Sequence, residues 1–321
     1  MTLPRIIYSP RYNIRGYGIE KWHPFDGQKY GKSWNAIEAR FPAAKQCLIE
    51  PTNQVRRAAL ARVHTAEHLQ QLGTAAYLAK VFETPKAAWV PALILDHLVL
   101  RPMRWATQGT ILALEAALTH GLAINLGGGF HHAKPSSGEG FNVYNDVPIA
   151  VADLRDRGLL SPTDVVLYVD CDAHQGNGIC HCFLNDRSVK VFDVFNDDVY
   201  PVADSVAQAR IDQRCPIRIG TSGDEYLLTL QRELPKFLDK LAMEGSQVCL
   251  AIYNAGTDVH QDDPLGALKL TSAEVLERDV WVVQQLRRRN LPVAMVLGGG
   301  YTQQGFQLVA DSVLALLEHA R

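Results

Sequence analysis

The chain lacks the features that mark several classes of protein. Its 321 residues contain no apolar run long enough to span a membrane, no internal repeat and no low-complexity tract. The formal net charge is −2 and no long basic run occurs, so we do not expect nucleic acid as a main partner. The first residues do not show the basic and then apolar pattern of a signal peptide. We therefore expect a cytoplasmic protein that binds neither membranes nor nucleic acid.

Six cysteines in a chain of this length are ordinary usage and are typical of a reducing compartment. The densest group, Cys180-His181-Cys182, has no second cysteine pair of the kind that structural zinc sites need, so we interpret these residues as structural thiols.

The chain does have the material for a large core. It is 47% hydrophobic, it contains no linker rich in glycine, serine or proline, and we expect one domain over residues 1–321. Short apolar runs rich in β-branched residues alternate with amphipathic stretches of helical spacing, which predicts a mostly parallel sheet with helices on both faces. The expected strands are 5–8, 47–50, 122–126, 165–169, 189–195, 216–219, 248–253 and 293–297. The expected helices are 105–119, 226–243, 272–289 and 305–319, the third beginning with a capping box at Thr271 and Glu274. Residues 83–100 are expected to form a long loop with little regular structure.

Two adjacent histidines, His131 and His132, follow three glycines at the end of the expected strand 122–126. Open α/β sheets build their sites at the carboxyl ends of strands. Because imidazole titrates near neutral pH, the pair suggests proton transfer or metal binding. The plainer alternative is one capping histidine and one surface histidine.

Acidic residues follow two further expected strands. Asp170, Asp172 and His174 come at the end of strand 165–169, and alternation along a strand would direct all three to one side. Strand 248–253 is followed by Asp258. Two carboxylates and one imidazole leave a coordination position open, as in a catalytic divalent site. Each aspartate by itself would more commonly be a helix cap or a turn residue.

A last motif ends strand 293–297, where three glycines precede Tyr301. A tyrosine hydroxyl can donate a hydrogen bond to an oxyanion. The alternative is an aromatic ring that only packs at the surface.

In this order and spacing, the four motifs resemble the zinc-dependent histone deacetylase family. Five further stretches are similar to its class IV branch, namely 13–14, 23–26, 99–102, 172–178 and 253–258. The resemblance implies the arginase–deacetylase fold, a three-layer α/β/α arrangement around a central, mostly parallel sheet of eight strands. It also implies one catalytic Zn²⁺ held by Asp172, His174 and Asp258.

The resemblance implies roles for the remaining motif residues. His132 would be the general base and acid, and His131 its electrostatic partner, held by Asp170 beside a K⁺ or Na⁺ site. Tyr301 and zinc would stabilise the oxyanion. Gly140 and Phe141 would line the substrate tunnel, and Tyr200 would form its opposite wall.

Two positions depart from the commoner family pattern. Many relatives have aspartate where this chain has Asn177, beside the second histidine. A neutral amide cannot stabilise an imidazolium as a carboxylate does, so we expect a lower pKa for His132 than in the aspartate-bearing branch. Asn142 replaces the cysteine that often follows the tunnel phenylalanine.

The expected activity is hydrolysis of an acyl group, acetyl or longer, from the ε-amine of lysine in proteins or peptides. Deacetylation of small amines such as acetylpolyamines is the alternative. An arginase-like enzyme with two metal ions is disfavoured because Gly176 stands where the second ion would need an acidic ligand. A reader of acyl-lysine without turnover is disfavoured because the ligands, both histidines and Tyr301 are all present. The oligomeric state stays open.

Overall fold

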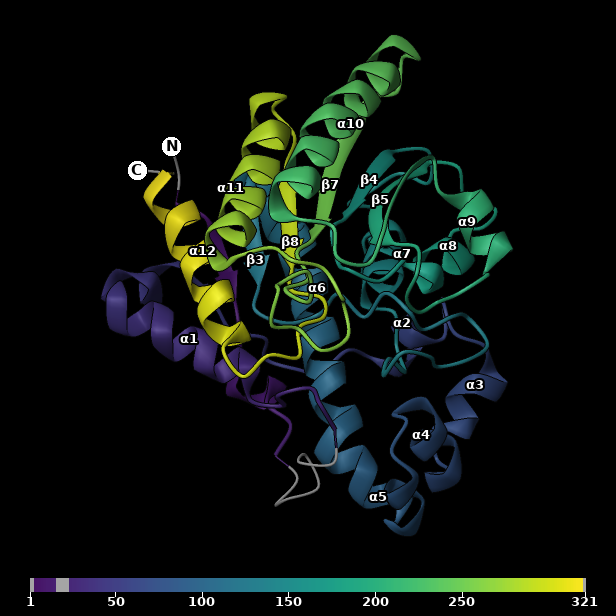
Figure 1. Cartoon of the computed structure of the whole chain (residues 1–321). Coiled ribbons are helices and arrows are strands. Elements are labelled where there is room, and N and C mark those ends of the chain that lie inside the picture. The colour runs from purple at the N-terminus through teal and green to yellow at the C-terminus, as the bar shows by residue number, and fades with distance from the viewer. Residues whose placement is uncertain (1–2, 16–22, 320–321) are drawn as a thin grey trace.

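A computed structural model describes residues 3–15 and 23–319, and a sheet of eight strands lies at its centre (Figure 1). The strand order is β2-β1-β3-β8-β7-β4-β5-β6, and every neighbouring pair is parallel. The strands are β1 (Arg5–Ile7), β2 (Leu48–Ile49), β3 (Leu122–Asn125), β4 (Val165–Asp170), β5 (Val189–Asn196), β6 (Gln213–Ile217), β7 (Val248–Asn254) and β8 (Val293–Val296). All eight expected strands are present, although β6 begins and ends earlier than the expected 216–219.

Helices cover both faces of the sheet, which confirms the three-layer α/β/α fold. One layer consists of α1 (Lys29–Arg40), α10 (Gly223–Met243), α11 (Ser272–Arg288) and α12 (Gly305–His319). The other contains α6 (Arg101–His120), α7 (Asp146–Asp156) and α8 (Asn177–Cys182). Shorter helices are α2 (Arg57–Leu60), α3 (Ala66–Gln71), α4 (Ala75–Val81), α5 (Ala92–Leu95) and α9 (Ser205–Arg210). The expected capping box at the start of α11 is formed by Thr271 and Glu274.

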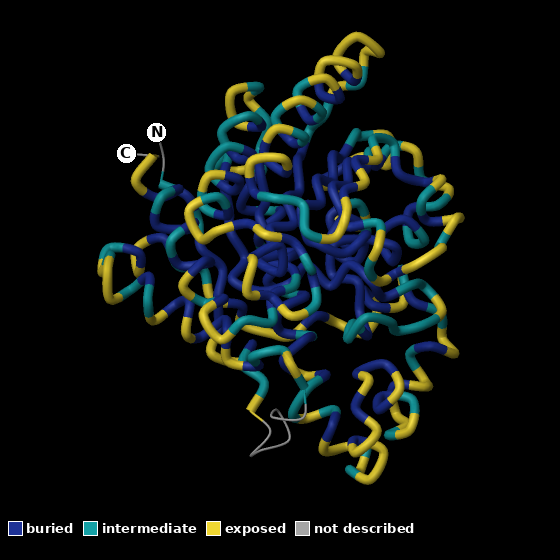
Figure 2. The backbone as a smooth tube through the Cα atoms, viewed as in Figure 1, coloured by how far each residue is buried: buried dark blue, intermediate teal, exposed yellow. Residues whose placement is uncertain are grey.

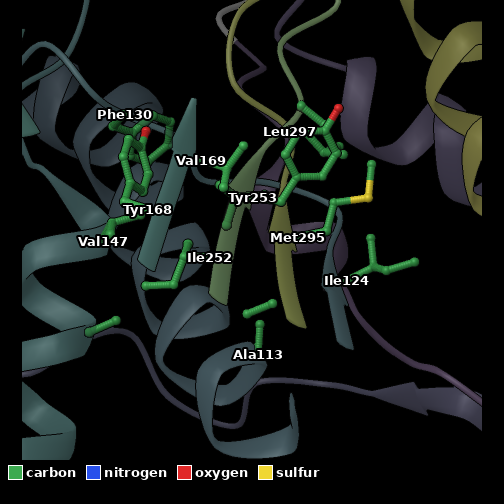
Figure 3. Close-up of a cluster of buried hydrophobic side chains, with 14 of the residues drawn as sticks. Ala113, Ile124, Phe130, Val147, Tyr168, Val169, Ile252, Tyr253, Met295 and Leu297 are labelled. Atoms are coloured by element: carbon green, nitrogen blue, oxygen red, sulfur yellow. The ribbon is translucent and has the colours of Figure 1, made fainter. Parts of the chain in front are cut away.

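The strands are apolar along almost their whole length because both faces of the sheet are covered. They lie in the dark blue centre of the molecule, while the exposed residues are on the outer faces and ends of the helices and in the connections (Figure 2). In Figure 3 the side chains of Tyr168, Ile252 and Met295 project from the neighbouring strands β4, β7 and β8 into this core. All six cysteines are free thiols.

The expectation of an unstructured loop over 83–100 is wrong. Pro85–Trp89 forms a 3₁₀ turn, α5 follows, and a π-helical turn over Asp96–Leu100 leads directly into α6. Pro85 stands in a first turn and Pro91 at an N-cap, positions that need no backbone N–H from the residue, so neither proline breaks a helix. Leu95 and Leu100 are buried and attach the segment to the core.

The sheet directs the site-bearing segments to one edge. Strands β3, β4, β7 and β8 are parallel neighbours in the middle of the sheet, so the loops that follow them leave from the same edge. Among the described residues, none of the helices combines the length and the hydrophobicity that crossing a membrane requires.

Candidate active site

Asp172, His174 and Asp258 meet at this edge of the sheet. Their ligand atoms lie within 4.8 Å of one another, and all three residues are buried. His174 Nδ1 is 3.2 Å from Asp172 Oδ1 and 2.9 Å from Asp258 Oδ2. Within residues 3–15 and 23–319, this is the one group of histidine, cysteine and acidic side chains that converges in this way.

The convergence comes from a turn and not from strand alternation, which corrects the sequence interpretation. β4 ends at Asp170, so Asp172 and His174 lie in the loop after it. In that loop, Asp170 Oδ1 accepts from the Asp172 N–H at 3.1 Å, and Asp172 Oδ1 accepts from the His174 N–H at 3.0 Å. Such aspartate turns bend the chain and bring alternate side chains together.

A buried arginine, which the sequence analysis did not identify, joins the two ligand-bearing loops. Arg278 Nη1 donates to the carbonyls of Cys171 and Gly256, each at 2.8 Å, and the guanidinium pairs with Asp279. The sequence feature that could have revealed this buried arginine is its position three residues after Val275, on the apolar side of the expected helix. The arginine fixes the separation of the loops that present Asp172 and Asp258.

The donor set fits a divalent metal ion. Burial, together with the charge of Asp172, raises the pKa of Asp258 to about 7. A cation between the two carboxylates would offset the cost of burying their negative charges side by side. Two carboxylate oxygens and one imidazole nitrogen are ligands that zinc accepts. Three protein ligands leave a position for water or substrate.

His131 is backed directly by a carboxylate. Its Nδ1 lies 2.9 Å from Asp170 Oδ2, and an ionised carboxylate can only accept, so Nδ1 donates. Tyr168 Oη and Asn254 Nδ2 also donate to Asp170, each at 2.9 Å. Burial lowers the pKa of His131, but the charges of Asp172 and Asp170 outweigh burial and raise it to about 9.

His132 is backed by an amide instead. Its Nδ1 lies 2.9 Å from Asn177 Oδ1, and its Nε2 lies 3.0 Å from His131 Nε2. Burial holds the pKa of His132 well below its usual value, with help from the charges of His131 and His174, while the Asn177 bond opposes the shift. His132 is therefore a neutral imidazole at pH 7.

Asp193 is a second acidic residue on the His131 side that the sequence analysis missed. It lies on β5 in register with Asp170 on β4, fully buried. Its Oδ2 accepts from the Gly176 N–H at 3.1 Å, while its Oδ1 has no partner among the described residues. Burial and the charge of Asp170 hold the pKa of Asp193 well above its usual value. The sequence signal was a carboxylate within an otherwise apolar strand.

A cavity lined in part by aromatic rings, which is where the substrate tunnel was expected, adjoins this site. Phe141 packs against His23 and Tyr301, with ring centroids 4.2 and 5.9 Å apart, and Phe25 lies 6.2 Å from Tyr301. Gly140 has a φ of +50°, and a Cβ there would lie 2.4 Å from the His132 ring. The structure thus brings Gly140, Phe141 and Tyr301 together with His132, and it adds His23 and Phe25, to which no role was assigned.

Tyr200 lies on the outer side of the same histidine. Its ring is 5.1 Å from that of His132, and the residue is 38% exposed.

Buried charges hold the loop that bears Tyr301. Lys29 Nζ donates to the Gly299 carbonyl at 2.7 Å, and the Gly299 N–H donates to Asp172 Oδ2 at 2.7 Å. The Tyr301 N–H donates to Asp263 Oδ2 at 2.7 Å. Burial lowers the pKa of Lys29 to about 8 despite the surrounding carboxylates. Neither Lys29 nor Asp263 was recognised as a site residue from sequence, because each supports the loop from a distant segment.

Comparisons with solved structures define the class of fold. The HD domain of HDA15 superimposes with a TM-score of 0.72 at 19% identity, covering 98% of this chain and 90% of that one. Acetylpolyamine aminohydrolase from Burkholderia pseudomallei gives a TM-score of 0.71 at 21% identity, covering 98% of both chains. The fold is that of the deacetylases.

Sequence comparisons then give the family. Residues 23–317 match the histone deacetylase domain. Histone deacetylase 2 of Arabidopsis thaliana is 36% identical over 310 residues, which are 96% of this chain and 77% of the relative. The chain belongs to the histone deacetylase domain family, and this membership supports hydrolysis of an acyl amide.

Proposed function

We propose that the protein is a zinc-dependent deacylase that removes an acyl group from the ε-amine of lysine in proteins or peptides. The observation that carries the proposal is the joint presence of three converging buried ligands, a neutral His132 and Tyr301 around one aromatic tunnel. When bound to Asp172, His174 and Asp258, zinc would polarise the amide carbonyl and acidify a water molecule.

The protein's own groups would move the protons. His132 Nε2 accepts the proton of the attacking water and then delivers it to the leaving amine. His131, positively charged beside it, stabilises negative charge as it develops. The Tyr301 hydroxyl donates a hydrogen bond to the oxyanion, and the rings of Phe141 and Phe25 keep the lysine stem out of water.

The lining of the cavity at this site is evidence in favour of a substrate whose acyl chain is longer than acetyl. Beyond the catalytic groups, it is lined by side chains of the segment 82–106 and its neighbours. Most of these side chains are apolar, namely Phe82, Leu95, Leu98, Val99, Met103 and Ala106. Apolar lining favours methylene groups over water, by about 0.8 kcal/mol for each buried CH₂.

We further propose a K⁺ or Na⁺ ion beside Asp170. Two carboxylates, Asp170 and Asp193, lie buried on adjacent strands, and the unpartnered Asp193 Oδ1 is a free ligand atom for such an ion. The neutral residue at Asn177 and the motifs shared with the class IV branch support placement in that class.

The test is turnover by the zinc-loaded protein on lysine peptides with acyl chains from acetyl to myristoyl, and on acetylpolyamines. We expect Tyr301→Phe to retain zinc and to lose about 10²–10³ in kcat, the usual effect of removing one oxyanion donor. Near-normal turnover in that variant would refute the role of Tyr301. Turnover of acetylpolyamines alone would refute the lysine substrate and leave the hydrolysis intact.

A further inference from the structure

A tight turn beside the tunnel places a carboxylate behind Asn177. Glu139 and Asn142 exchange backbone hydrogen bonds of 3.1 and 2.8 Å, and the two residues between them both have positive φ, +50° and +67°. This geometry presents Phe141 to the tunnel and turns the Glu139 side chain toward Asn177. Asn177 Nδ2 donates to Glu139 Oε2 at 3.1 Å.

The contacts form a chain with a fixed direction, from Glu139 through Asn177 to His132. A carboxylate can only accept, so the Asn177 NH₂ must face Glu139. The Asn177 oxygen therefore faces His132 and can only accept from Nδ1. A neutral His132 with its hydrogen on Nδ1 keeps Nε2 unprotonated, and this nitrogen accepts from Nε2 of the charged His131 at 3.0 Å.

Glu139 is itself held in place from two sides. Tyr200 Oη donates to Oε2 at 3.0 Å, and Lys134 Nζ lies 3.0 Å from Oε1. Lys134 also pairs with Asp204 at 3.1 Å, and Asp204 pairs with His181 at 3.0 Å. Glu139 thus has one oxygen bound to the ammonium group of Lys134 and the hydroxyl of Ser137, and the other to Asn177 and Tyr200.

We propose that Glu139 is a positioning residue that locks the amide orientation of Asn177 and thereby the tautomer of His132. Aspartate at position 177 would not need this lock, because either of its oxygens accepts from Nδ1. An asparagine presents the wrong group to His132 if its amide rotates by half a turn. The tautomer of His132 is inferred from the hydrogen bonds of Asn177. The expected effect on kcat rests in addition on the proposed function.

The substitution Glu139→Gln tests the lock while conserving shape. The new amide has a single oxygen, and the charged Lys134 is the stronger competitor for it. The glutamine NH₂ then faces Asn177, whose amide must turn and donate to His132 Nδ1. His132 would then have its hydrogen on Nε2, where it cannot act as a base, and His131 would have to give up its own Nε2 hydrogen, because the 3.0 Å contact between the two rings holds only one.

The first experiment reads the tautomer without any turnover. In the metal-free protein at pH 7, the ¹⁵N spectrum of the imidazole side chains, assigned with His132→Gln, should show Nδ1–H for His132 in the wild type. It should show a major population of Nε2–H in Glu139→Gln. The same tautomer in both proteins would overturn the proposal, and this result does not depend on whether the protein is a deacylase.

The second experiment is a double-mutant cycle on kcat with Asn177→Asp. We expect Glu139→Gln to lower kcat about 10- to 100-fold in the wild-type background, part of the ~10²–10⁴ that a positioned base supplies, with KM little changed. In the Asn177→Asp background, the same change should not lower kcat, because position 177 no longer has an amide to turn and Glu139→Gln there removes one of two carboxylates that would face each other.

Glu83→Gln is the matched control, since it removes an exposed carboxylate whose charge also acts on Tyr200. It should leave kcat unchanged in both backgrounds. An equal loss from Glu139→Gln in both backgrounds, or no loss in either, would overturn the proposal. If no variant turns over any substrate while the tautomer changes as expected, the proposed function fails and the lock stands.

Discussion

The two adjacent histidines belong to one site but contact different kinds of partner, a carboxylate for His131 and a neutral amide for His132. On the His131 side, the carboxylates of Asp170 and Asp193 lie buried on neighbouring strands, and Asp170 contacts the imidazole directly. On the His132 side, the direct partner is the neutral amide of Asn177, and a carboxylate, that of Glu139, lies behind this amide. The resulting pKa values move apart, to about 9 for His131 and well below the usual value for His132.

The difference teaches how one dipeptide can supply both a cation and a base. A histidine that stays protonated at neutral pH provides fixed positive charge, and one that stays neutral can accept a proton. Burial alone would lower the pKa of both rings. The charges of Asp172 and Asp170 around His131 are therefore what separate the two pKa values.

The largest effect is expected when each imidazole ring is removed in turn. We expect His132→Ala to lower kcat by about 10²–10⁴, the contribution of a positioned general base. His131→Ala should cost less, because its charge assists and does not transfer the proton. Steady-state kinetics at equal zinc content measures both, and a larger loss from His131→Ala would reverse the assignment.

The next effect concerns the paired carboxylates on the His131 side. If K⁺ or Na⁺ occupies a site there at about a hundredfold excess over Kd, it contributes roughly 3 kcal/mol to stability. Exchange for tetramethylammonium, which is too large for a buried site, should then lower Tm by several degrees. Calorimetry of wild type and Asp193→Asn measures the effect.

The asparagine variant serves as the control for that measurement. With one carboxylate neutralised, Tm should respond little to the exchange of cations. A response of full size in Asp193→Asn would exclude that carboxylate as a ligand.

A smaller effect is expected when the His132 side is made like the His131 side. Asn177→Asp places a negative charge next to His132 and raises its pKa, because the charge favours the imidazolium. A base with a higher pKa loses its activity at a higher pH, so the acidic limb of the kcat/KM profile should move upward by about one unit. An unmoved limb would mean that the nature of the partner does not set the basicity of His132.

The sequence was sufficient for the parts of the molecule in which neighbours along the chain decide the structure. Apolar strands such as β4 and the capping box of α11 follow from local pattern. The candidate ligands Asp172 and Asp258 could be predicted because each lies in the loop that follows a strand. The path between Asp170 and His174 could not, since it depends on side chains that accept from backbone N–H groups.

Other features needed the tertiary structure. Lys29 and Arg278 support the site from helices that are distant in sequence, and a buried charge in a helix does not reveal which carbonyl it will meet. Glu139 was missed for the same reason, because its meaning depends on the residue at position 177. The segment 83–100 reads as a loop from its two prolines, because the sequence does not show that both stand at helix starts, where proline is tolerated.

The smallest expected effect distinguishes the ring of His132 from its backbone. Asn142 Oδ1 accepts from the His132 N–H at 3.0 Å, so this residue holds the main chain while Asn177 holds the imidazole. Asn142→Ala should cost about 1 kcal/mol of stability, the usual value of one hydrogen bond, and change kcat less than about threefold. Because no charge near the ring changes, the acidic limb should stay where it is. Thermal unfolding and a pH profile of this variant measure both quantities, and a displaced limb would show that the basicity of His132 depends on where its backbone is held as well as on what faces its ring.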